Sequence, residues 1–102
     1  MDLHPGETVI LEKLANIRRK FEYAGGQVVV TNQRVRLLPH SMNLDSRPAE
    51  VALADIATVE PFSQFGFIPT GIRLTRKDGA QQHFICWGRA AVMAAIRGAM
   101  GG

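Results

Sequence analysis

The sequence is poor in cysteine and histidine, and it has no long apolar run. Its one cysteine, Cys86, allows neither an internal disulfide nor a multi-cysteine metal site, so we expect a reducing, cytoplasmic setting. The longest unbroken apolar run covers residues 90–96, far short of the ~20 residues that span a bilayer. We therefore expect no integral membrane segment. Asp2 and Glu7 also stand where a signal peptide would carry positive charge followed by an apolar stretch.

The net charge of the chain is also small. Twelve Lys and Arg against nine Asp and Glu leave a net charge of +3, which is too little for strong non-specific binding to nucleic acid. The hydrophobic share of 46% and the charged share of 21% are typical of an ordinary globular chain. Because 102 residues suit one domain with one core, we expect a single domain over residues 1–102 and no nucleic-acid partner.

Residues that could carry chemistry are scattered along the chain. The three histidines, His4, His40 and His83, have no second ligand at the spacing of a metal site, and His83 is expected to face solvent. Cys86 lies in an apolar strand-like run, where burial raises the pKa of a thiol and makes it inert. The sequence has no nucleophile elbow, no close carboxylate pair and no phosphate-binding glycine loop. We expect no enzyme, no metal and no cofactor.

Several short strand-like runs, separated by turn residues, make up most of the chain. The first run, 8–17, alternates imperfectly, which indicates a bulge or a strand buried on both faces. Gly25-Gly26 predicts a break before the β-branched strand at 28–30. Clean alternation over 34–37 predicts two apolar side chains pointing inward and the guanidiniums of Arg34 and Arg36 pointing outward.

The second half of the chain predicts more turns and one helix. Asp55 predicts a turn between two short strands, because its side chain can hydrogen-bond to nearby backbone. Two Pro, two Gly and three Phe over 61–71 predict an apolar loop, and Lys77-Asp78-Gly79 predicts a hairpin turn. The residues from Arg89 to about Met100 favour a helix with one apolar stripe. About seven antiparallel strands closed by this helix would form a small barrel or sandwich.

Three segments of the chain form a series. They are residues 25–35, which contain Gly-Gly, a strand and Thr-Asn-Gln-Arg-Val, residues 51–60 and residues 72–84. Together they resemble the GRAM-type branch of the pleckstrin-homology-like fold. Gln33 replaces the lysine usual in this family, and Arg36 stands where an apolar residue is common. The resemblance implies a mainly β fold, in which a pleckstrin-homology-like barrel of about seven antiparallel strands is capped by a C-terminal α-helix.

The resemblance also implies a place for an anionic ligand. In this fold three connections surround one open end of the barrel, where many family members hold anionic lipid headgroups. Six basic residues against three acidic ones leave +3 in those connections, whereas the rest of the chain is neutral. Such an excess would draw the domain to an anionic membrane, although charged loops are also ordinary solvated loops. The candidates are Arg18, Arg19, Lys20, Arg47, Arg76 and Lys77.

Apolar residues suggest a different kind of partner. Three Phe within six residues, flanked by Pro, either fold back to plug the barrel or present an aromatic anchor to a partner. The expected helix is apolar nearly all round, which favours burial on a second side. The candidates for protein contact are Phe62, Phe65, Phe67, Ile68, Met93 and Met100.

The sequence therefore predicts a non-catalytic module that acts by protein–protein contact, self-association included. The alternative is peripheral binding to anionic lipid headgroups. The preference for Arg over Lys and the many Ala residues indicate a GC-rich prokaryotic source, where phosphoinositides are scarce. That composition favours the protein partner over the lipid, in the cytoplasm or at the membrane periphery.

Overall fold

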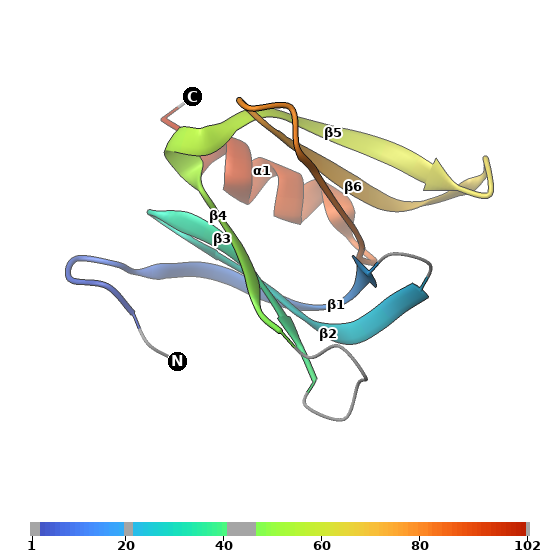
Figure 1. Ribbon diagram of the computed structural model, residues 1–102, viewed down its shortest axis with the longest axis horizontal. Helices are drawn as coiled ribbons and strands as arrows, with labels where there is room; N and C mark the ends of the chain where they lie inside the picture. Colours follow the sequence, from blue (N-terminus) through green and yellow to red (C-terminus); the bar gives the residue numbers. More distant parts are fainter. Residues whose placement is uncertain (1–2, 20–21, 41–46, 102) are drawn as a thin grey trace.

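The structure, a computed structural model, describes residues 3–19, 22–40 and 47–101. Within these ranges the chain forms strands, one short 3-10 turn and one helix (Figure 1). In chain order they are β1 (Val9–Arg19), β2 (Glu22–Thr31), β3 (Arg34–Pro39), β4 (Ala49–Ala52), η1 (Leu53–Asp55), β5 (Ile56–Gln64), β6 (Ile68–Arg76), β7 (Gln81–Ile85) and α1 (Arg89–Ala99).

The seven strands form one antiparallel sheet in the order β4-β3-β2-β1-β7-β6-β5. The sheet curves so that β1–β3 face the β5–β6 pair, and α1 lies between these two parts (Figure 1). The two parts are joined by β1, which pairs with β7 at Asn16 and Ile17. This is the predicted mainly β fold of about seven antiparallel strands with one C-terminal helix, and the prediction is confirmed.

The core lies inside this curve and is built from alternate strand residues. Ile17, Leu37, Ile72 and Phe84 are fully buried, as Val92 and Ile96 of α1 are. Burying each large apolar side chain stabilises the fold by about 1.5–3 kcal/mol relative to leaving it in water. Three residues of the predicted helical stripe point into the core, namely Val92, Met93 and Ile96.

Two arginines attach α1 to the edge strand β5. The Arg89 guanidinium donates to the carbonyl oxygens of Phe62 (2.7 Å) and Gly71 (3.2 Å), and Arg97 donates to that of Val59 (2.8 Å). A sheet edge with free backbone groups can pair with another chain, and natural proteins often cover such edges. The helix therefore closes the core and also occupies backbone acceptors of β5.

The sequence predicted a break at the glycine pair, and this prediction is wrong. Instead β2 runs through Gly25 and Gly26 to Thr31. A Cβ atom on Gly26 would lie 2.3 Å from the carbonyl oxygen of Leu38, so glycine here lets β3 approach closely. The predicted bulge in the first strand is confirmed, because the pairing of β1 with β2 shifts register between Val9 and Leu11.

Arg34 lies on the outer face of β3, as the alternation predicted, but it is not exposed to solvent. Its guanidinium is buried and donates to the Glu7 carboxylate through Nε (2.8 Å) and Nη2 (2.9 Å), and it also pairs with Glu50. The same carboxylate accepts hydrogen bonds from the Thr31 hydroxyl (2.7 Å) and the His4 backbone N–H (2.8 Å). Arg34 is buried because the N-terminal segment folds over this face of β3 and supplies Glu7 as a buried partner. Arg34 and these hydrogen bonds lower the pKa of Glu7 to about 2, although burial opposes the shift.

The predicted turns are confirmed in two places and wrong in one. The 3-10 turn η1 ends at Asp55 between β4 and β5, and residues 77–79 form the β6–β7 turn. The predicted loop over 61–71 is instead a hairpin, because β5 continues to Gln64 and β6 begins at Ile68. Only residues 65–67 form the turn between them.

Candidate binding surface

Two phenylalanines stand exposed at the tip of the β5–β6 hairpin. Phe65 is 79% exposed and Phe67 is 76% exposed, so neither ring plugs the barrel. The turn is closed by hydrogen bonds from the N–H of Gly66 to the Ser63 carbonyl and from the N–H of Phe67 to the Gln64 carbonyl. Phe65 and Gly66 have φ angles of 54° and 84°, the left-handed region that normally favours Gly or Asn. The fold thus holds two aromatic side chains away from the core at the end of the β5–β6 ladder.

Two further large apolar side chains are exposed near this hairpin. Trp87, between β7 and α1, is 76% exposed, and Leu14 of β1 is 74% exposed. Leu14 and Trp87 line the same pocket as Gln64 and Ile68, the residues that flank the hairpin turn. We call Leu14, Phe65, Phe67 and Trp87 the contact surface.

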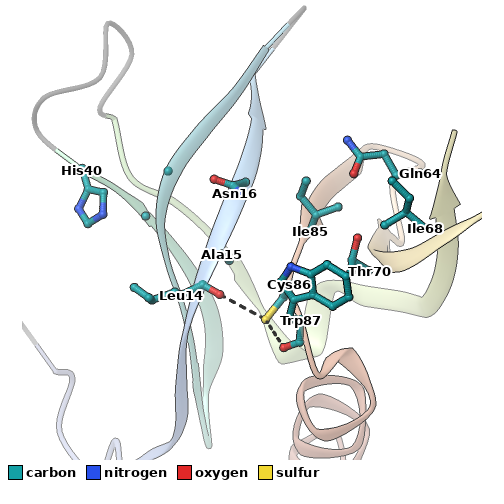
Figure 2. A pocket seen from close by; sticks show the side chains of 12 residues that line it. Leu14, Ala15, Asn16, His40, Gln64, Ile68, Thr70, Ile85, Cys86 and Trp87 are labelled. Atoms are coloured by element: carbon teal, nitrogen blue, oxygen red, sulfur yellow. Dashed lines mark hydrogen bonds between the residues drawn. The ribbon is translucent and has the colours of Figure 1, made fainter.

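The pocket itself has a volume of about 430 Å³. Figure 2 shows Gln64 and Ile68 on one side of it, His40 on the opposite side, and Asn16 between them. The residues of β2 that line the pocket are Gly25 and Gly26. Because neither has a side chain, this stretch of β2 leaves the space open. The lining residues are Leu14, Ala15, Asn16, Gly25, Gly26, His40, Gln64, Ile68, Thr70, Ile85, Cys86 and Trp87.

Cys86 forms part of this pocket but is not built as a nucleophile. Its side chain is buried, as the strand alternation predicted, and its Sγ lies 3.4 Å from the carbonyl oxygens of Leu14 and Trp87 (Figure 2). Burial raises the pKa of the thiol, and the positive charge of Lys13 offsets this only in part. A protonated thiol beside backbone carbonyls has a structural role.

The described part of the chain offers no cluster of three or more His, Cys, Asp or Glu that could hold a metal ion. Within the same residues, no helix is both long and apolar enough to cross a membrane. What the surface provides is apolar area around a pocket, with amide, imidazole and hydroxyl groups from Asn16, His40, Gln64 and Thr70. Such an arrangement binds by shape and burial, with a few polar groups to orient what is bound.

The other residues predicted for protein contact lie in different surroundings. Met93 is buried in the core, because it belongs to the inward stripe of α1, and a contact role for it is not supported. Met100 is partly exposed just beyond the end of α1. Phe62 is half-buried and covers Gly71, where an added Cβ atom would lie 2.6 Å from the Phe62 ring. Ile68 is half-buried in the pocket wall, so Phe65 and Phe67 are the most exposed members of this group.

The structure separates the predicted basic residues. Arg18 is exposed near the end of β1, and Arg47 is exposed before β4. The side chain of Arg19 and the whole of Lys20 lie outside the described residues. Arg76 donates to the Glu50 carbonyl (2.8 Å), and the backbone N–H of Lys77 donates to the Asp55 carbonyl (2.9 Å). These bonds hold the β6–β7 turn beside η1, well away from the end of β1 in Figure 1.

A group that the sequence did not indicate lies on the outer side of the sheet. In the strand register, Arg73 of β6 lies opposite His83 of β7 and opposite Glu60 of β5. Arg18 is close enough for its positive charge to affect the pKa of His83. Burial lowers the pKa of His83, and the positive charges of Arg18 and Arg73 lower it further. His83 was predicted to face solvent, but it is half-buried against the edge of the Phe62 ring, with 5.5 Å between ring centroids. The signal that could have indicated this group is the alternation of side chains along β6 and β7, which places Arg73 and His83 on the same face of the sheet.

A curved, seven-stranded antiparallel sheet closed by one C-terminal helix has the pleckstrin-homology-like fold, and solved structures share it. The C-terminal domain of an unknown protein from Leishmania infantum matches with a TM-score of 0.82 and 10% identity, over 96% of this chain and 88% of that chain. The N-terminal PH domain of Vps36 matches with a TM-score of 0.71 and 16% identity, over 98% and 86% respectively.

A structure of the N-terminally truncated linker-DH/PH domains of p115-RhoGEF also matches, with a TM-score of 0.71 and 12% identity. That match covers 96% of this chain and 30% of the other. No protein-family model matches the sequence, and no curated protein does. The similarity therefore establishes the fold, and the function has to be argued from the surface.

Proposed function

We propose that this chain is a non-catalytic binding module, a pleckstrin-homology-like domain of the GRAM type over residues 1–102, which acts by protein–protein contact. The observation that carries the proposal is the contact surface. Its four large apolar side chains, Leu14, Phe65, Phe67 and Trp87, are each about three-quarters exposed. Leu14 and Trp87 line the pocket, and Phe65 and Phe67 lie between Gln64 and Ile68, which line it too. Extended apolar patches on a folded protein mark places where a partner binds.

The energetics favour binding through these side chains. Burying one large apolar side chain gains about 1.5–3 kcal/mol, so a partner that covers several of them has a substantial driving force. Tryptophan and other aromatic residues are enriched among the residues that dominate binding energy. The β5–β6 pairing ends at Gln64 and Ile68, and two backbone hydrogen bonds close the turn that carries Phe65 and Phe67. Part of the backbone entropy is therefore lost before binding.

Affinity capture from a native lysate tests this proposal. The bait would be the wild-type chain, the double variant Phe65→Ser/Phe67→Ser, and a control, Ile10→Ser. Ile10 is an exposed apolar residue of β1 that does not line the pocket. We expect the wild type and the control to capture the same proteins, and the double variant to lose them. Equal capture by all three baits would overturn the proposal.

The alternative function is peripheral binding to anionic lipid headgroups. What supports it is the exposed Arg18, two residues from Asn16 in the pocket wall and followed in the sequence by Arg19 and Lys20. Each basic residue near an anionic membrane surface contributes about 1 kcal/mol of attraction. Co-sedimentation with phosphatidylserine vesicles at low and high salt tests it. Binding that weakens with salt and with Arg19→Glu supports the lipid function, and no binding at low salt excludes it.

A further inference from the structure

We propose that the partner of the contact surface is a second copy of this chain. In this arrangement the hairpin tip of each copy, Phe65 to Phe67, enters the pocket of the other, and a two-fold axis relates the copies. The inference rests on the proposed function, because it specifies the protein that the surface contacts. Neither the fold nor its structural neighbours require it.

The first argument is that each copy carries a projection and a pocket side by side. Gln64 and Ile68 line the pocket, whereas Phe65 and Phe67, between them in sequence, are 79% and 76% exposed. The hairpin therefore forms one wall of the pocket while its tip lies outside it. A surface with an adjacent projection and pocket is self-complementary under two-fold rotation, which places the projection of each copy opposite the pocket of the other.

The second argument is the chemistry of the pocket. Its volume of about 430 Å³ is in the range of ligand-binding pockets, and its walls include the apolar side chains of Leu14, Ile85 and Trp87. Among the described residues that line it, none is Asp, Glu, Lys or Arg. Near a two-fold axis, side chains of one kind from the two copies approach one another, so like charges there would repel. A strongly acidic or basic partner would find no opposite charge in the pocket lining.

The third argument is area. A fully buried aromatic side chain removes about 150–250 Å² from water, so Phe65, Phe67 and Trp87 at their observed exposure offer about 150 Å² each. Both copies contribute in a two-fold pair, which gives about 900 Å² from the aromatic residues alone. Leu14 and the pocket walls add to this. A specific interface requires about 1,000 Å², so we expect a reversible pair of modest affinity, with a dissociation constant near the micromolar range.

Sedimentation equilibrium of the purified chain, from about 10 µM to about 1 mM, tests the pair directly. We expect a monomer–dimer equilibrium for the wild type and for the control Ile10→Ser. Phe65→Ser/Phe67→Ser removes the projection and should raise the dissociation constant at least about thirtyfold, since truncating central aromatic residues costs 2 kcal/mol or more. A wild-type chain that stays monomeric throughout this range would overturn the inference.

A second variant blocks the pocket and keeps the projection. An added Cβ atom on Gly25 would lie 3.6 Å from the His40 ring and 3.7 Å from Asn16 Oδ1, both ordinary contacts with residues that line the pocket. The Cβ atom of Gly25→Val therefore fits the strand, and its two methyl groups reduce the space in the pocket. We expect it to be folded, by circular dichroism and thermal unfolding, and to weaken the pair as strongly as the hairpin variant.

Mixing the two variants distinguishes this geometry from unspecific apolar adhesion. Phe65→Ser/Phe67→Ser still has an open pocket, and Gly25→Val still has both rings. Each variant alone can form neither contact of the pair, whereas a mixed pair forms one of the two. Mass-tagged samples should therefore give a mixed dimer stronger than either homodimer. A mixture that associates no more than its components would refute the insertion of the tip into the pocket.

The remaining outcomes separate this inference from the proposed function. If the wild type is monomeric but the lysate capture depends on Phe65 and Phe67, the surface binds a different protein, and only the second-copy inference fails. If the wild type is monomeric and binds phosphatidylserine vesicles in a way that requires Phe65 and Phe67, the occupant is a membrane. If the wild type is monomeric and neither capture nor vesicle binding depends on these residues, the proposed function fails together with the second-copy inference.

Discussion

Alanine at Gly26 and alanine at Gly25 should have opposite effects on stability, although the two glycines are adjacent in β2. At Gly26 the new Cβ atom would lie 2.3 Å from the Leu38 carbonyl oxygen and 2.7 Å from the Pro39 Cα atom. Both neighbours are backbone, so β3 must move by about 1 Å for ordinary contact. At Gly25 the nearest atoms are 3.6 Å and 3.7 Å away and belong to side chains.

The expected magnitudes follow from these distances. Overpacking in a close-packed region costs about 1–3 kcal/mol, while replacing Gly by Ala gains about 0.4–1 kcal/mol through the unfolded chain. We expect Gly26→Ala to lower the free energy of unfolding by about 1–2 kcal/mol. Gly25→Ala has no overpacking cost and should be neutral or slightly stabilising.

Urea unfolding followed by circular dichroism measures both variants against the wild type. With a slope of about 1–3 kcal/mol per molar urea, Gly26→Ala should lower the midpoint by about 1 M without a change of slope. Its melting temperature should fall by roughly 5–10 °C, while that of Gly25→Ala should not fall. Equal midpoints for the two variants would show that the close approach of β3 at Gly26 does not constrain the fold.

Three further predictions concern the ionised groups. The folded pKa of Glu7, about 2, lies below its ordinary value of 4.5, so its contribution to stability is complete above pH 4.5 and is lost as the pH falls from 4.5 towards 2. Acid unfolding of Glu7→Gln should lack this part of the pH dependence, and an unchanged profile would contradict the assignment. Arg97→Met should lower the free energy of unfolding by about 1 kcal/mol through loss of the bond to the Val59 carbonyl, measured in urea against the exposed control Ala94→Ser. The imidazole of His83 should titrate below pH 6.5 by NMR, since burial and two arginines disfavour its charged form, and a midpoint at or above 6.5 would contradict its surroundings.

Local patterns in the sequence were sufficient for most of the fold. Alternation and turn residues predicted the hairpin at 77–79, the turn at Asp55 and the bulge in β1, because these depend on neighbouring residues. They could not predict the burial of Arg34, because its partner, Glu7, is 27 residues away in sequence. They failed at Gly26 for the same reason, because the strand that requires a glycine there is β3.

The contact surface was predictable only in part. The density of Phe over 62–67 left open a plug of the barrel or an aromatic anchor, and the structure leaves Phe65 and Phe67 exposed. Trp87 and Leu14 were not predicted, since an apolar residue in an apolar run normally lies inside, and their exposure depends on where β7 leaves β1. The basic residues were assigned to one end by resemblance, whereas hydrogen bonds to the carbonyls of Glu50 and Asp55 place Arg76 and Lys77 beside β4 and η1.

The backbone of Phe65 has a consequence for how this protein can change. Its φ of 54° suits Gly or Asn far better than an aromatic residue, and a bulky side chain held there costs of the order of 1 kcal/mol or more. A search for more stable variants would therefore replace Phe65 early, and the improved protein would have lost an exposed ring of its contact surface. An exposed side chain that the fold retains at a cost is one whose benefit has to be sought outside folding.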